Sequence, residues 1–338
     1  MPPFARPAPE AFRRGLLALV ANPGLILAPL AFAAVVVGAV AVPVFVLLVG
    51  LAGFHRGFPR VSDFARDAES LLPRLGSFFE GLLAAPFVLV GGLLCLLVLL
   101  LLLTLVAAYL RAGIMGSLVA IDAHAAEDAL LPAFHRPGLG AVFRGSARRL
   151  FGRFFALVNL YSLALSFLVL LILLPIGLVV LAATGERGGF VIAALVLFLL
   201  FLPLVIGGSV ALRVLYLVSC RLAASDDVDA LEAVARSVSL IRTSLSRVVL
   251  LYLLALAAGF VSGFAFLVPR FALSFFAGRS LILFFVGTGL LMAAQILVSF
   301  AYDLIVTGAF VSLWPVATGG SVPPVASAPD DNAPPLLV

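Results

Sequence analysis

The stretch "LLAAPFVLVGGLLCLLVLLLLLTLVAAYL", residues 82–110, contains no charged residue. A helix needs roughly 20 apolar residues to cross about 30 Å of bilayer hydrocarbon, so this stretch is long enough to span a membrane. Similar charge-free runs occupy residues 24–53, 155–185, 188–212, 248–269 and 280–302. Because the runs are continuous and lack the strict alternation of barrel strands, they predict an all-α integral membrane protein with six transmembrane helices.

The composition supports the same class. Hydrophobic residues make up 64% of the 338 residues and charged residues 11%, and the mean hydropathy is +1.27. An ordinary soluble domain is roughly 45–50% apolar and about a quarter charged. All 21 basic residues are arginine, which suits phosphate headgroups through its planar fork of donors, although the codon usage of a GC-rich genome is the simpler interpretation. Cys95 and Cys220 are too isolated to indicate a disulfide framework or a thiolate metal site.

The arginines predict the orientation of the spans. With the N-terminus inside, 14 arginines flank the spans on the cytoplasmic side and seven on the opposite side. Because basic residues are enriched in cytoplasmic loops, both termini are expected in the cytoplasm, in a bacterial cytoplasmic (inner) membrane. The cytoplasmic set is Arg6, Arg13, Arg14, Arg111, Arg136, Arg144, Arg148, Arg149, Arg153, Arg213, Arg221, Arg236, Arg242 and Arg247, and the opposite set is Arg56, Arg60, Arg66, Arg74, Arg187, Arg270 and Arg279.

A polar stretch, "DDVDALEAVARSVSLIRTS" at residues 226–244, interrupts the apolar runs. Asp229 followed by Glu232 three positions later predicts the start of a helix. From there an aliphatic stripe recurs at spacings of three and four, formed by Leu231, Val234, Val238, Ile241 and Leu245. We expect this amphipathic helix to lie along the inner leaflet, with its arginines near headgroups and its stripe either in the membrane or against the spans.

The same pattern occurs twice more, at residues 142–155 and before the first span. In residues 142–155 one face contains Phe143, Ala147, Leu150, Phe151 and Phe154. The other helix begins near residue 9 and is expected to stop at Asn22-Pro23-Gly24. Its apolar residues are Phe12, Leu16, Leu19 and Val20. Each of the three surface helices precedes a pair of spans. The chain therefore consists of three helix-plus-hairpin units, produced either by triplication or simply by helices that turn the chain at the membrane face.

The text "ALEAVARSVSLIR", from Ala230 to Arg242, allows one comparison. Together with the six-span plan, it resembles poorly characterised bacterial membrane-protein families related to the membrane domain attached to some glycerophosphoryl diester phosphodiesterases. The resemblance extends over roughly residues 10–305, but Thr243 stands where those families commonly have Gly, and no Trp follows. It implies a six-span fold and no particular activity. The matching positions are Leu231, Arg236, Ser237, Leu240 and Arg242.

No catalytic motif is present, and we predict a protein that is not an enzyme. The chain lacks a Gly-x-Ser-x-Gly elbow and a His-Glu-x-x-His helix, and a phosphate-binding Gly-x-x-x-x-Gly-Lys loop is impossible without lysine. His55-Arg56-Gly57 matches the start of the phosphodiesterase site, but its companion motifs are missing. The nearest approach to a metal site is Asp122, His124, Glu127, Asp128 and His135, which we interpret as a solvated loop. We expect no cofactor, no metal and no nucleic-acid partner.

Few polar residues fall at membrane depth. Arg213 and Asp303 lie near the expected inner ends of spans four and six and are predicted to pair, either to hold the spans together or to gate a path. Gly259 and Gly263 predict a close helix approach. The other candidates are Asn159, Thr288, Gln295, Ser299 and Tyr302.

The expected organisation is a single membrane domain over residues 1–318 and a disordered, Pro-rich tail over residues 319–338. Residues 53–81 are expected to form an outer surface helix. The leading functional hypothesis is a non-enzymatic protein that organises membrane lipid or a protein partner, including a second copy, at its cytoplasmic face. The alternative is a transporter or permease-like protein for a lipid or small amphiphile. The candidate headgroup contacts are Arg144, Arg148, Arg149, Arg153, Arg236 and Arg242.

Overall fold

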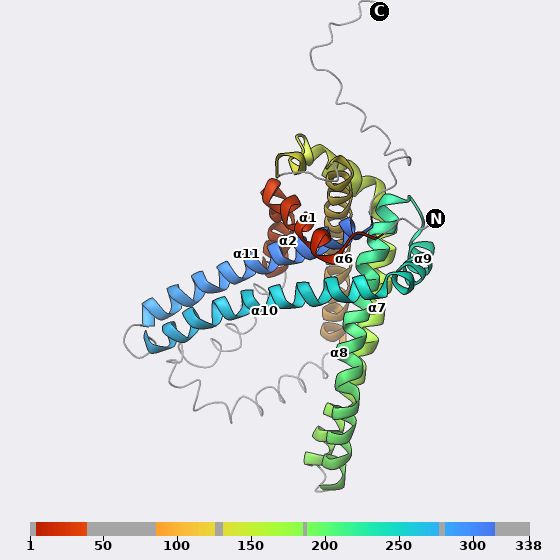
Figure 1. Ribbon diagram of the computed structural model, residues 1–338. Helices are drawn as coiled ribbons and strands as arrows, with labels where there is room; N and C mark the ends of the chain where they lie inside the picture. The colour runs from red at the N-terminus through yellow and green to blue at the C-terminus, as the bar shows by residue number, and fades with distance from the viewer. Residues whose placement is uncertain (1–4, 39–85, 126–130, 185–187, 277–280, 315–338) are drawn as a thin grey trace, which may run out of the picture. The chain divides into compact units, whose positions relative to one another are not determined.

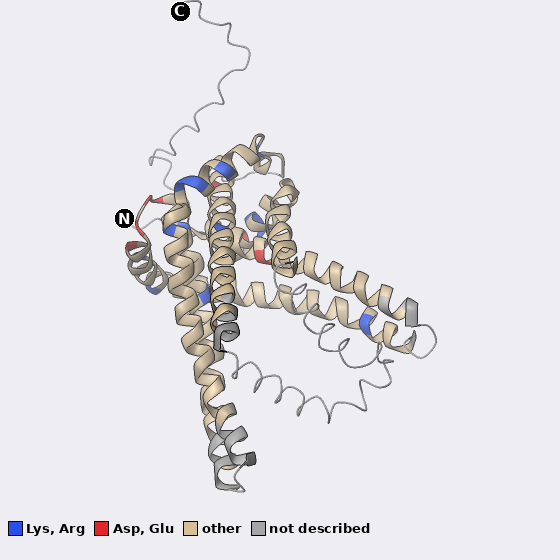
Figure 2. Cartoon of the chain, turned by 180° about the vertical axis from the view of Figure 1, so that it is seen from behind, with Lys and Arg blue, Asp and Glu red and all other residues tan. Residues whose placement is uncertain are grey.

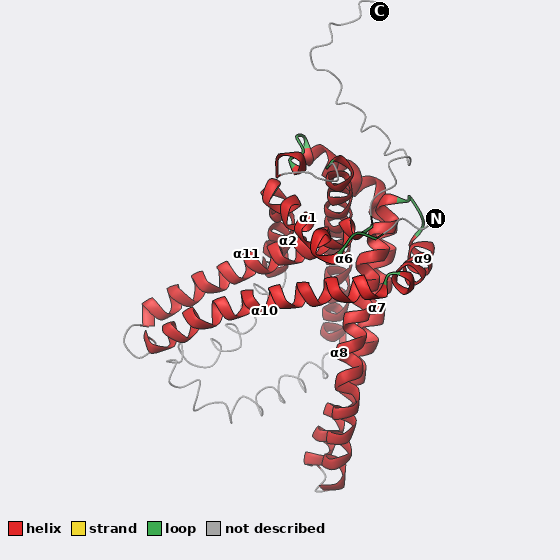
Figure 3. Ribbon diagram, in the orientation of Figure 1, coloured by secondary structure: helices red, strands yellow, loops and turns green. Residues whose placement is uncertain are grey.

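The computed structural model describes residues 5–38, 86–125, 131–184, 188–276 and 281–314 (Figure 1). All regular elements within these ranges are helical (Figure 3). In chain order they are α1 (Ala8–Ala21), the short 3-10 helix η1 (Pro23–Ile26), α2 (Leu27–Val36), α6 (Pro86–His124), the 3-10 helix η3 (Leu131–Phe134), α7 (Leu139–Thr184), α8 (Gly188–Ser225), α9 (Ala230–Thr243), α10 (Leu245–Phe276) and α11 (Leu281–Leu313).

Five of these helices are long and apolar enough to cross a membrane, and they correspond to five of the six predicted spans. The qualifying segments are Leu97–His124, Leu139–Pro175, Leu195–Ser225, Leu245–Phe275 and Val286–Leu313. The architecture is that of an all-α, multi-pass membrane protein. The remaining predicted span, residues 24–53, is described only as far as residue 38. Its beginning forms, with α1, a pair of helical segments bent by 90° between Ala21 and Pro23, at the predicted Asn-Pro-Gly stop.

The chain divides into two compact units, residues 30–107 and the remainder. In the larger unit α7 lies beside α8 and α10 lies beside α11, so that each pair forms a hairpin (Figure 1). The expected outer helix at residues 53–81 and the expected tail at residues 319–338 lie outside the described residues. The predicted membrane domain of residues 1–318 thus contains the whole of the smaller unit and most of the larger one.

The hydrophobic core of the larger unit gathers at one end of its helices. The charge-free run of α8 ends at residue 212, but the helix continues to Ser225, and the extra turns are buried. The last turns of α6 and α11 are buried in the same way, and the first turns of α7 bury one face, with Val142, Ala147 and Leu150. We call these ends, with α1, α9 and the start of α10, the packed body. Its largest fully buried apolar side chains are Trp314, Phe134, Phe154, Phe310, Ile121, Leu150, Leu157, Leu251 and Leu313.

Away from the packed body, the hairpins expose their aliphatic side chains. Leu163 on α7, Val261 on α10 and Leu290 on α11 are each about 70% exposed within the unit. Hydrocarbon solvates such side chains as well as protein does, so a membrane span gains little by burying them. In the described residues 155–212, 248–276 and 281–302 of the two hairpins, the only charged side chain is Arg270 (Figure 2).

The three predicted surface helices take different forms. Residues 142–155 are helical as expected, and Ala147, Leu150 and Phe154 are buried, but the segment is the start of α7 and runs directly into the span. No break separates it because the helical hydrogen bonding continues through residue 184. By contrast, α1 and α9 are separate helices, which end at Asn22 and Ser244.

The helix α1 packs on α11 through small residues. A Cβ atom at Gly15 would overlap the backbone of Ile305 and Ala309, so the two helices touch backbone to backbone. Gly308 lies opposite, and a Cβ there would be 3.1 Å from the Gly15 Cα. The buried face of α1 contains Ala8, Ala11, Arg14, Gly15, Ala18 and Leu19, whereas Leu16 and Val20 of the predicted apolar set are exposed.

Candidate functional site

Two arginines share one aspartate where α6, α8 and α11 meet. Arg213 Nη2 lies 2.7 Å from Asp303 Oδ1, and Arg111 Nη1 lies 3.0 Å from Asp303 Oδ2. The structure therefore brings together Arg213 and Asp303, the two residues predicted to pair, and adds Arg111 to them. All three side chains are partly exposed, at 45%, 29% and 39% for Arg213, Asp303 and Arg111.

A simple signal in the sequence marks all three members of this triad. Arg111 is the first charged residue after the charge-free run 82–110, and Arg213 and Asp303 hold the same place after the runs 188–212 and 280–302. The first charge after each run lies at the same depth when the runs end on the same side of the membrane. From the sequence, Arg111 was assigned only to the topology of the spans, and its place in the triad was not predicted.

The other polar residues expected at depth lie apart from the triad. Asn159 bonds the carbonyl oxygen of Phe155 one turn earlier, and Tyr302 donates its hydroxyl to Ala255 O at 2.7 Å. Gln295 accepts a hydrogen bond from Arg270 at 2.7 Å. It lies eight residues from Asp303, which corresponds to about 12 Å along α11. A substrate cavity lined jointly by Arg213, Gln295 and Asp303 is therefore not formed in the described part of the chain.

A second charged centre lies inside the packed body, around Asp122. Its carboxylate accepts hydrogen bonds from Arg14 Nε at 3.0 Å, Arg6 Nη1 at 3.1 Å and Ser312 Oγ at 2.9 Å. The side chains of Arg14 and Asp122 are only 1% and 4% exposed. Asp122 is thus neutralised by arginine. Among the described residues no group of three metal-ligating side chains converges, and the predicted Glu127 and Asp128 lie outside them.

The buried arginines also bind carbonyl groups at helix C-termini. Arg221 Nε donates to Val311 O at 3.1 Å and its guanidinium lies over the Trp314 ring, while Arg6 donates to Ser312 O. Arg14 Nη2 donates to Ala125 O, just after the end of α6. The last carbonyls of a helix have no partner within the helix and carry partial negative charge, so they stabilise buried cations. This explains how two arginines can share the one aspartate, Asp122.

The six arginines predicted to contact headgroups fall into two groups. Arg153 pairs with Asp227 and lies 3.9 Å from Asp229, and Arg236 pairs with Glu232 at 2.5 Å. The hydrogen bond from Arg153 lowers the pKa of the Asp227 carboxyl. The other four are exposed and have no acidic side chain at ion-pair distance in the described ranges. We call them the unpaired arginines: Arg144, Arg148 and Arg149 in the first turns of α7 and Arg242 on α9 (Figure 2).

The helix α9 begins at Ala230, as the sequence predicts, and it packs on α8 through small residues. Ala233 and Ser237 are fully buried, and the Ser237 hydroxyl lies 3.0 Å from that of Ser219 on α8. At 100° per residue, this small-residue face is rotated by about 90° from the aliphatic stripe. The stripe is left uncovered at both of its ends, because Leu231 is 75% exposed and Leu245 56%.

This chain was compared with known proteins in three ways. A scan against protein-family models, a search of curated proteins and a search of solved structures each gave no match. The resemblance to families related to the phosphodiesterase membrane domain therefore stays a prediction. The candidate sites of the described residues are the triad, the buried centre around Asp122 and the unpaired arginines of α7 and α9.

Proposed function

We propose that this chain is a non-enzymatic component of the bacterial cytoplasmic membrane that binds and organises anionic lipid at its cytoplasmic face. The observation that carries the proposal is the exposure of the unpaired arginines together with the two ends of the aliphatic stripe, Leu231 and Leu245. The helices α7 and α9 are in contact, and the ion pair of Arg153 on α7 with Asp227, just before α9, joins them. A membrane surface offers both complements, phosphate for arginine and hydrocarbon for the stripe.

Electrostatics would select the lipid, and apolar burial would add affinity. Each arginine near an anionic leaflet contributes about 1 kcal/mol, so the four unpaired arginines contribute on the order of 4 kcal/mol before screening by salt. Arg153 and Arg236 are already neutralised by acids and should contribute less. Burying the exposed parts of Leu231 and Leu245 adds about 25 cal/mol per Å² of apolar surface, independent of lipid charge.

The lipid preference of the purified protein tests this proposal. In nanodiscs containing equal phosphatidylglycerol and phosphatidylcholine, the protein should enrich phosphatidylglycerol in its surrounding shell. The variant Arg148→Gln/Arg149→Gln should lose much of that enrichment, whereas the control Arg153→Gln/Arg236→Gln, which removes the same charge from paired arginines, should lose less. Equal losses in the two variants would show that only total charge matters, and no enrichment in the native protein would refute the proposal.

The orientation of the chain in the membrane is tested by a separate measurement. In a background without Cys95 and Cys220, cysteines placed at Gly57 and Gly188 should react with a membrane-impermeant maleimide added outside the cell. Cysteines at Gly145 and Ser239, both exposed in the structure, should remain protected until the membrane is opened. Outside labelling of Ser239→Cys in intact cells would place the packed body on the wrong side and refute the cytoplasmic assignment.

The alternative, a transporter or permease-like protein, is supported by the triad at membrane depth, because intramembrane charges usually serve a function. It is the weaker hypothesis. In the described residues both oxygens of the Asp303 carboxylate are held by arginine, and Gln295 bonds Arg270 instead of joining them. A partner protein on the α7 and α9 surface, or a second copy of this chain, would compete with lipid for the same residues. Release of lipid on oligomerisation would identify that case.

A further inference from the structure

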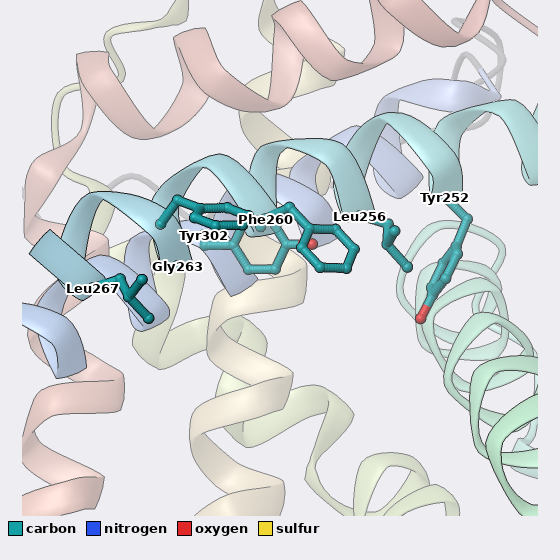
Figure 4. Close-up of a pocket in the computed structure, with 8 residues that line it drawn as sticks. Tyr252, Leu256, Phe260, Gly263, Leu267 and Tyr302 are labelled. Atoms are coloured by element: carbon teal, nitrogen blue, oxygen red, sulfur yellow. The ribbon is translucent and has the colours of Figure 1, made fainter.

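An apolar groove of about 410 Å³ runs along α10, where α11 packs beside it (Figure 4). Tyr302 reaches into it from α11; its ring lies against Gly259 and its hydroxyl bonds Ala255 O. The groove continues past Gly263, where a Cβ atom would meet nothing within 4 Å. The lining residues are Tyr252, Leu256, Gly259, Phe260, Gly263, Phe264, Leu267 and Tyr302.

The groove is long enough to hold an acyl chain across the hydrocarbon of one leaflet. From Tyr252 to Leu267 α10 rises about 22 Å at 1.5 Å per residue. One leaflet provides about 15 Å of hydrocarbon, half of the roughly 30 Å core. An acyl chain that enters at the Tyr252 end can therefore lie within the groove over its whole length. The lining is almost entirely apolar, so its natural occupant is a hydrocarbon chain.

Positive charge lies next to the Tyr252 end of the groove. Tyr302, which lines the groove, is followed directly by Asp303, and Arg213 binds the Asp303 carboxylate at 2.7 Å. Arg111 and Arg213 share this single carboxylate, and no other acid of the described residues pairs with them. The triad thus keeps one uncompensated positive charge at the depth where the apolar runs end. A charge at the edge of the hydrocarbon is costly unless it is paired, and phosphate is the anion available at that depth.

We propose that the groove and Arg213 form a binding site for one anionic phospholipid. One acyl chain occupies the groove between Tyr252 and Leu267, and the headgroup phosphate accepts hydrogen bonds from Arg213, whose side chain is 45% exposed. This inference depends on the proposed lipid function in one respect, the assignment of the ligand as an anionic lipid. It uses none of the unpaired arginines of α7 and α9.

Gly263 provides a way to close the groove without disturbing the fold. Since a Cβ atom at this position meets only open space, Gly263→Leu should fill the groove, and replacing glycine within a helix also favours the helix. Gly207→Leu on α8 is the matched control, because a Cβ atom there also meets nothing within 4 Å and the residue does not line the groove. Arg213→Gln removes the headgroup contact, and Arg213→Lys retains the charge.

Native mass spectrometry of protein released from nanodiscs of equal phosphatidylglycerol and phosphatidylcholine measures the occupancy. The native protein and Gly207→Leu should each retain one phosphatidylglycerol molecule. Gly263→Leu should retain it at least about tenfold less, because the chain loses its burial site. Arg213→Gln should still retain a lipid but without preference between the two headgroups, and Arg213→Lys should restore the preference.

Several outcomes would overturn the site. Retention by Gly263→Leu equal to that of the control would show that no chain lies in the groove, and an unchanged headgroup preference in Arg213→Gln would remove the phosphate contact. The variant Arg148→Gln/Arg149→Gln should lose the enriched lipid shell but keep the single retained lipid. Loss of both in that variant would mean that one surface accounts for all binding, which would overturn the separate site and leave the proposed function intact.

Discussion

The two short helices α1 and α9 are built alike but attached differently. Both turn a small-residue face to the protein, with Gly15 and Ala11 in α1 and Ala233 and Ser237 in α9, and both leave leucines exposed. In α1 the contact includes the buried Arg14 and a backbone-to-backbone approach to α11. In α9 it is made by small side chains, one pair of hydroxyl groups and the half-buried Val234, Leu240 and Ile241. The difference predicts that α1 is needed for the fold, whereas α9 can separate from the body at low cost.

Arg14→Met should have the largest effect. The substitution leaves Asp122 buried with Arg6 and Ser312 alone, and breaking a buried ion pair from one side costs about 3–5 kcal/mol. The matched change on α9, Arg236→Met, removes an exposed pair with Glu232 that contributes about 0.3–0.5 kcal/mol. Unfolding in mixed micelles should separate the two variants clearly. Similar losses would show that α1 and α9 are equally important to stability.

Gly15→Val should have the next largest effect on stability. The added side chain would overlap the backbone of Ile305 and Ala309, which cannot move without separating α1 from α11. Overpacking of this kind costs about 1–3 kcal/mol, and more where backbone must shift. Gly152→Val on α7 is the control, since a Cβ atom there meets nothing within 4 Å. The melting temperature in detergent should fall for Gly15→Val well beyond the control, and a melting temperature equal to that of the control would contradict the close packing.

Ser237→Val should loosen α9 and leave the rest of the body intact. Ser237 is fully buried, with its hydroxyl 3.0 Å from Ser219 Oγ and 2.7 Å from Val234 O. The larger side chain should push α9 away from α8, at a cost of about 1–2 kcal/mol. Amide hydrogen exchange should therefore rise over residues 230–243, while α1 keeps its protection. Exchange that rises equally in α1 would show that the two helices unfold together.

Loss of the Asp227 pair with Arg153 on lowering the pH should have the smallest effect of the four. Because Arg153 lowers the pKa of Asp227 in the folded protein, the carboxylate stabilises this contact above its unfolded pKa. That contribution is lost as the pH falls through the folded pKa, below about 4. Asp227 is largely exposed, so the change should stay below about 1 kcal/mol. Hydrogen exchange at the start of α9 should rise on acidification in the native protein and less in Asp227→Asn.

Much of the fold follows from charge-free runs, because the bilayer imposes a minimum length on each span. Five spans, the start of α9 at Ala230 and the end of α1 at Asn22 lie where the sequence predicts them. The extension of α8 to Ser225 was not predicted, because the residues beyond the charge-free run have the composition of an ordinary soluble helix. Those residues become core only because other helix ends meet them.

The sides of α1 and α9 that face the protein were harder to predict from the sequence. Hydrophobicity ranks Leu16 and Leu231 above Ala11 and Ala233, and in water that order would place leucine inside. Beside a bilayer, leucine loses nothing by facing lipid, and small residues gain close helix packing. The Arg213 and Asp303 pair was predictable because both are first charges after their runs. The neutralisation of Asp122 by Arg6 and Arg14 was not, because it depends on contacts more than 100 residues apart in the chain.

The bonds of Arg6 have a consequence for biosynthesis. Its partners Ser312 and Leu313 lie at the end of α11, about 306 residues later in the chain. These contacts can form only after α11 has been synthesised and inserted, whereas Arg14 can bind Asp122 and Ala125 as soon as α6 is in place. Asp122 likewise gains its hydrogen bond from Ser312 only at that stage. The packed body is therefore completed only when its last helix joins it.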